Sequence, residues 1–75
     1  MKFSELRENC TARAYRLIVI LADGESHTEE ISLDYTVEPG RKLGLWAGAA
    51  VEWFRPTITQ WPHGIVNTLE VELHA

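Results

Sequence analysis

The sequence predicts an α+β domain in which a three-stranded antiparallel sheet, with strand order 2-1-3, carries one helix packed on one face. Three observations lead to this prediction. Two segments with β-type patterns flank Asp23-Gly24, a third alternating segment lies near the end of the chain, and the segment between them changes to helical spacing. Because the chain has 75 residues, we expect a single small domain spanning residues 1–75.

The first two strands are predicted to form a hairpin. After Arg13 the chain runs through β-branched and aromatic residues to Leu21, and Asp23-Gly24 follows. This pair favours a tight turn because both positions accept a positive φ. Residues 30–37 then alternate between apolar and polar, which is typical of a strand with one buried face and one exposed face. Upstream, residues 3–9 favour one short helical turn.

The remaining elements are a helix and a third strand. Residues 41–55 carry apolar side chains at helical spacing, namely Leu43, Trp46, Ala47, Ala50, Trp53 and Phe54. We therefore expect a helix that buries this side and ends before Pro56. Residues 56–64 are predicted to form an extended loop, with room for a short edge strand at residues 57–59, and residues 65–74 alternate as a strand.

Strand one is apolar on both faces, so a single helix leaves one of its faces uncovered. With a two-residue loop at Asp23-Gly24, Ile18 and Ile20 lie under the helix, and the open face carries Tyr15, Leu17, Val19 and Leu21. Changing the loop length by one residue reverses the two sets. In either case an apolar stripe remains, surrounded by Glu30, Asp34, Glu38, Glu70 and Glu72. Apolar surface ringed by charge usually marks a contact site.

The charge of the chain bears on its partners. Seven Lys and Arg residues against eleven Asp and Glu residues give a net charge of −4, which disfavours direct binding of nucleic acid. Between Asp23 and Glu38 the acidic residues are not balanced by any Lys or Arg. We therefore expect a protein partner with a basic surface, unless this segment is simply solvated.

Trp61 is the most prominent single candidate for a contact residue. It lies in the loop between Pro56 and Gly64, where Pro56 and Pro62 restrict the backbone. An indole held on a stiff loop loses little entropy on binding, and Trp is enriched among interface hot spots. The alternative is that Trp61 folds back as a lid over the core.

Catalysis, metal binding and cofactor binding are not expected. Cys10, His27, His63 and His74 are too far apart in the sequence for a typical metal site, and no catalytic or phosphate-binding motif is present. A single cysteine favours a reducing, cytoplasmic location. The N-terminal residues lack the apolar region of a signal peptide, and the longest apolar run, residues 43–51, is too short to span a membrane.

The function we predict is a non-catalytic protein–protein interaction module. Its expected contact residues are Trp61, Glu30, Asp34, Glu38, Glu70, Glu72, Leu17 and Val19. In size and acidity the chain is similar, as a class, to small phage or mobile-element accessory proteins that inhibit a host protein by occluding its surface. The alternative is a structural homodimer or subunit that completes its core by pairing sheet faces. A nucleic-acid mimic or a small enzyme is the remaining hypothesis.

Overall fold

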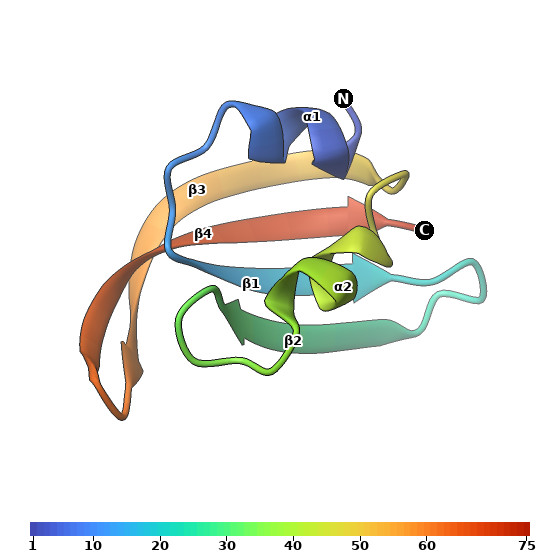
Figure 1. Cartoon of the computed structure of the whole chain (residues 1–75). Helices are drawn as coiled ribbons and strands as arrows, with labels where there is room; N and C mark the ends of the chain where they lie inside the picture. Colours follow the sequence, from blue (N-terminus) through green and yellow to red (C-terminus); the bar gives the residue numbers. More distant parts are fainter.

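The computed structural model describes all residues from 1 to 75. The chain forms α1 (Phe3–Glu8), β1 (Ala14–Ile20), β2 (Ser26–Ser32), α2 (Pro39–Gly44), β3 (Ala50–Trp61) and β4 (Gly64–His74). The strands build one sheet in the order β2-β1-β4-β3, and both short helices contribute to the core on the same face (Figure 1). The predicted α+β class is confirmed. The sheet has four strands instead of three, however, and there are two short helices instead of one packed helix.

The strand directions differ from the prediction in one respect. β1 lies between β2 and the last strand, as expected, and it pairs antiparallel with β2. It pairs parallel with β4, however, so the prediction of an entirely antiparallel sheet was wrong. The reason is β3, which reverses the chain once more before β4 begins. Residues 56–61 belong to this full strand, where the sequence predicted an extended loop with room for only a short edge strand at residues 57–59.

The largest correction concerns the helix predicted over residues 41–55. Only Pro39–Gly44 is helical, and β3 begins at Ala50. Gly44 and Gly48 weaken a helix here, while β-branched and aromatic residues follow them. Pairing along the whole of β4 then satisfies the backbone groups of β3 that face β4. The prediction of a strand at residues 65–74 is confirmed by β4.

β2 ends at Ser32 rather than at residue 37. The hydroxyl of Ser32 accepts hydrogen bonds from the backbone N–H groups of Asp34 and Tyr35, both at 3.2 Å. Thr36 closes the turn from the other side, because its Oγ1 accepts from the Ser32 N–H at 2.8 Å. Local bonds of this kind compete with strand pairing. The alternation of residues 30–37 therefore overestimated the strand, and Val37 is 78% exposed.

The hairpin between β1 and β2 decides which face of β1 is buried. Its loop has three residues, because the Leu21 N–H donates to the Glu25 carbonyl at 2.8 Å and Gly24 takes a φ of 88°. The register is one residue away from that of a two-residue loop, with Tyr15 opposite Ile31. The face assigned on the basis of a two-residue loop was therefore wrong.

The core lies between the helices and one face of the sheet, which we call the covered face. Phe3 of α1 packs edge-on against Tyr15 of β1, with 5.7 Å between ring centroids, and Leu43 of α2 is fully buried in the same cluster. The N-terminus is tied to the start of β3, since the Phe3 N–H donates to the Ala49 carbonyl at 2.9 Å. Neither helix has the length and apolar character needed to cross a bilayer.

Candidate functional site

The candidate site is the sheet face opposite the helices, which we call the open face. Alternate residues of all four strands point to this side, and the pairing register brings them into rows. Its central residues are Glu30 of β2, Arg16, Ile18 and Ile20 of β1, Glu70 and Glu72 of β4, and Trp53 and Arg55 of β3.

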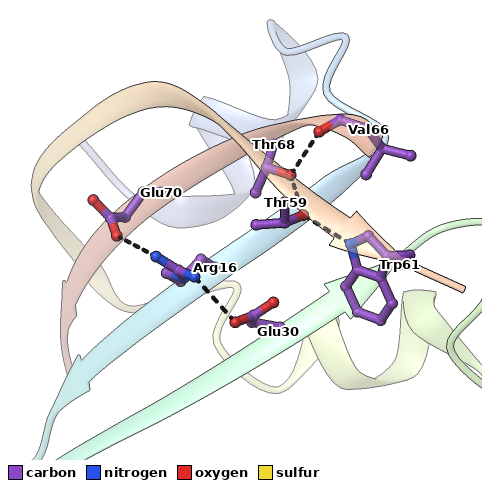
Figure 2. Close-up of polar contacts among 7 residues, drawn as sticks. All are labelled: Arg16, Glu30, Thr59, Trp61, Val66, Thr68 and Glu70. Atoms are coloured by element: carbon purple, nitrogen blue, oxygen red, sulfur yellow. Dashed lines mark hydrogen bonds and ion pairs between the residues drawn. The ribbon is translucent and has the colours of Figure 1, made fainter. Parts of the chain in front are cut away.

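One row forms a line of alternating charge across the whole sheet, which we call the ionic row. Arg16 lies opposite Glu30 and beside Glu70, and Arg55 lies opposite Glu70. Arg16 donates to Glu30 at 3.2 Å and to Glu70 at 3.4 Å, and the Nε of Arg55 donates to Glu70 at 2.5 Å. Figure 2 shows Arg16 reaching between the two glutamates. Two acids and two bases leave the row neutral.

Glu70 is the anchor of the ionic row rather than part of an exposed acidic rim. Its side chain is only 6% exposed and has a guanidinium group on each side. Burial by itself would raise the pKa of Glu70, but hydrogen bonds from Arg55 and Arg16 outweigh burial and hold the pKa below its usual value. The sequence prediction did not include Arg16 or Arg55. A charged residue inside the apolar run of strand one was the available signal for Arg16.

Next to the ionic row lies a small hydrophobic area, which we call the apolar patch: Ile18, Ile20 and Trp53. The two isoleucines are half-buried, and Trp53 is 37% exposed. The guanidinium of Arg55 lies over the Trp53 ring at 5.7 Å from its centroid. The prediction that Trp53 belongs to the buried side of a helix was wrong, because Trp53 stands on the open face of a strand.

At the other end of the open face, Trp61 is held by a chain of hydrogen bonds. Its indole N–H donates to Thr59 Oγ1 at 2.7 Å, Thr59 and Thr68 share a contact of 2.6 Å, and the Thr68 hydroxyl donates to the Val66 carbonyl at 3.2 Å (Figure 2). Since Thr68 has one hydroxyl proton, Thr59 is the donor in the contact between them. Trp61 is half-buried. Its position therefore lies between the two hypotheses made from the sequence, an exposed contact residue and a lid folded over the core.

This arrangement predicts a stability effect at Trp61. Trp61→Phe keeps an aromatic ring but removes the N–H donor, so we expect the free energy of unfolding to fall by about 1 to 2 kcal/mol. Trp53→Phe is the matched control, because its indole makes no hydrogen bond, and it should cost less than half as much. Urea unfolding of both variants is the measurement. Equal losses would show that the hydrogen-bonded chain contributes nothing.

Aromatic rings outside the sheet extend this end of the molecule. Tyr35, from the turn after β2, lies 6.0 Å from the Trp61 ring and stacks on His63 at 5.6 Å between ring centroids. The tip of the β3–β4 hairpin therefore packs against the segment that follows β2. Sequence patterns did not reveal this contact, because Tyr35 was placed in a predicted strand and Trp61 and His63 in a separate predicted loop.

Two predicted contact residues are inaccessible. Leu17 and Val19 are both fully buried on the covered face, within the core cluster. The prediction that they line the open face was wrong, because the three-residue loop after β1 reverses the two sets of side chains. Ile18 and Ile20 occupy the open face in their place.

The predicted acidic residues divide into two groups. Glu30 and Glu72 join Glu70 on the open face, where Glu72 lies 3.0 Å from His74. The other two lie in the segment after β2. Asp34 is paired with Arg13, whose hydrogen bond is the main reason that the pKa of Asp34 is below its usual value. Glu38 lies 3.6 Å from Arg41 at the start of α2. The predicted rim is thus not one continuous surface.

A pocket of about 390 Å³ lies at the edge of the covered face, beside the segment that links α1 to β1. Leu6, Cys10, Phe54 and Leu69 are among its lining residues. Cys10 also approaches Tyr15, and burial first, then the contact with Cys10, raises the pKa of Tyr15 to about 12. Nowhere in the chain do three or more potential metal-ligating side chains come together.

Comparison of the chain with protein-family models, with curated proteins and with solved structures found no match.

Proposed function

We propose that this protein is a non-catalytic binding module that contacts a protein partner through the open face. The observation that carries the proposal is the apolar patch. Trp53 exposes 37% of its surface on a sheet face that no helix covers, next to the half-buried Ile18 and Ile20. Apolar surface bordered by charged groups is typical of protein contact sites.

Rigidity supports this proposal. Trp53 stands on a strand, and Arg55 stacks over it while its Nε is held by Glu70. Trp and Arg are the residues most enriched among interface hot spots, and side chains that are already ordered lose little entropy on binding. The apolar patch and Arg55 therefore replace Leu17 and Val19 as the proposed centre of the contact.

The charges around the open face favour a basic partner. The ionic row is neutral in itself, and Glu72 is a further acidic residue beside it on the open face, with His74 at 3.0 Å. The chain as a whole carries a net charge of −4. Complementary charge speeds the encounter of two proteins more than it strengthens the complex. Trp61 is assigned a supporting role, because its N–H is already bonded within the chain.

The experiment is capture from an extract of cells that naturally make the protein, with three immobilised forms. These are the wild type, Trp53→Ala and Leu45→Ala, the last being a control because Leu45 is 71% exposed in the turn after α2. We expect the same protein to be retained by the wild type and by Leu45→Ala, with at least about tenfold less on Trp53→Ala. Melting curves confirm that the variants are folded. Equal retention on Trp53→Ala would contradict the proposal.

A further inference from the structure

The two edges of the sheet differ in how they are protected. In an antiparallel pair, alternate residues point their N–H and C=O groups toward the neighbouring strand, and the residues between them point theirs away. In the β1–β2 hairpin, Leu21 bonds Glu25 and Leu33 bonds Arg13 through the backbone. The odd-numbered residues of β2 therefore face β1, and the even-numbered residues face the outer edge.

Three of these outward residues are free. Ser32 is not among them, because Thr36 accepts from its N–H at 2.8 Å and donates to its carbonyl at 3.1 Å. The backbone groups of Ser26, Thr28 and Glu30 make no hydrogen bond outside the strand pairing, and all three residues are exposed. Figure 1 shows β2 as an outer strand of the sheet. Unpaired backbone groups on an edge strand are a template for another strand.

The opposite edge, formed by β3, is blocked. Pro56 lies near its middle and pairs with Leu69, a position at which the missing N–H would have pointed outward. A bulge interrupts β3 between Val51 and Trp53, and Met1 already bonds the Val51 N–H at 2.9 Å. Proline, bulges and local covering are among the means by which proteins prevent edge pairing. β2 has no proline and no bulge, and its covering by Thr36 is limited to Ser32.

We infer that β2 is the self-association edge: two copies of this chain pair antiparallel along it, about a two-fold axis at Thr28. In this register Thr28 faces Thr28 of the partner subunit, and Ser26 faces the partner's Glu30. All three free residues of each copy are then used, with about two backbone hydrogen bonds per facing pair. The two four-stranded sheets become continuous, and the open face of each copy stays uncovered.

The charges on β2 select this register. His27 faces the partner's Glu29, so an acid meets an imidazole and no two acids are directly opposed. Moving the axis by one residue places Glu29 opposite the partner's Glu29, or Glu25 opposite the partner's Glu29. Moving it by two residues places Glu30 opposite the partner's Glu30. Like charges directly opposite destabilise a pair of strands, so the axis at Thr28 is favoured.

Net charge works against the dimer at long range, since each copy carries −4. Salt screens such repulsion, with a Debye length of about 10 Å at 0.1 M. The local pairs at the edge are short-ranged and are less affected. We therefore expect dimerisation to strengthen between about 50 mM and about 500 mM NaCl.

Sedimentation equilibrium at total concentrations from about 10 µM to about 2 mM tests the dimer. The wild type should rise from the mass of one chain, 8.5 kDa, toward twice that value. Thr28→Pro removes an outward N–H without touching the bonds to β1, and should raise the dissociation constant at least about tenfold. Gln60→Pro, at an outward position of β3, and Trp53→Ala, on the open face, should leave the dissociation constant unchanged. A wild-type mass that stays at 8.5 kDa overturns the inference, and so does a dimer that Thr28→Pro does not weaken.

The register has its own test. In a Cys10→Ser background, Thr28→Cys should form a covalent dimer on mild oxidation, because facing strand residues lie about 5.5 Å apart at Cα, within disulfide range. Glu29→Cys in the same background is the control, since the two copies of position 29 are separated along the strands. If Glu29→Cys cross-links faster than Thr28→Cys, the axis lies elsewhere and the inferred register fails. The Trp53→Ala variant separates this inference from the proposed function. If it no longer captures the partner but still dimerises, the partner binds the open face and the dimer forms at the β2 edge.

Discussion

Leu17→Ala is expected to lower the free energy of unfolding by about 2 to 5 kcal/mol, the range for a leucine removed from a packed core. Leu17 is fully buried on the covered face, in the cluster that includes Phe3 and Leu43. Since domains of this size have only a few kcal/mol of stability in total, much of the variant should be unfolded at room temperature.

Ile18→Ala is the matched control for this prediction, because the two residues are neighbours on one strand and lose similar volumes. Ile18 is half-buried on the open face, so its loss should be less than half that of Leu17. Urea unfolding followed by tryptophan fluorescence gives both values. A larger loss for Ile18→Ala would mean that the hairpin adopts the register of the two-residue loop, with the opposite face of β1 buried.

Glu70→Gln is expected to lower the free energy of unfolding by about 1 to 3 kcal/mol at neutral pH. The variant keeps the size of the side chain but removes the charge that holds Arg16 and Arg55. Both arginines reach solvent, so neither is left as a buried, unpaired charge. The loss should therefore stay below that of breaking a fully buried ion pair.

Glu70 also predicts a pH dependence with a definite sign. Its pKa in the folded protein lies below the ordinary value of 4.5, so the folded state holds the proton less tightly than the unfolded chain. The stabilisation is complete above the ordinary pKa and is lost as the pH falls through the folded value. Urea unfolding between about pH 6 and pH 3 should show a shallower decline for Glu70→Gln than for the wild type.

Asp34→Asn is the control, because the pKa of Asp34 is also lowered, by Arg13. It shows how much of the loss of stability at low pH comes from Asp34 and how much from Glu70. That pair is exposed, so its contribution should be smaller and should disappear in high salt. If Glu70→Gln follows the wild-type curve at every pH, the ionic row does not contribute to stability.

Two strands could be predicted because their sequence pattern agrees with their place in the folded sheet. β4 alternates in the sequence and has the expected bounds, and β1 was recognised from its β-branched residues. The helix over residues 41–55 was wrong because apolar residues spaced three and four apart over a short segment fit either a helix or an irregular turn followed by a strand. Pairing with β4 decided between them.

For the candidate site, the sequence predicted an uncovered, partly apolar sheet face with acidic residues near it. Glu30, Glu70 and Glu72 do lie on that face, while Leu17 and Val19 lie on the covered face, in the core. Arg16 was not recognised as a site residue, because its role depends on two partners, Glu30 and Glu70, that are distant along the chain. A pair that is formed by sheet register leaves no local spacing to detect.

By itself, the sequence determined the class of the fold, the turn at Gly24 and the hydrophobic character of β1 and β4, because these depend on composition and on neighbours along the chain. Only the tertiary structure decided the parallel pairing of β1 with β4, the strand at Ala50–Trp61 and the side of the sheet on which each residue of β1 lies. The physical reason is that strand pairing is non-local. A shift of one residue in a loop changes little in local energy, yet it exchanges the two faces of a strand, and the burial of the whole core selects between them.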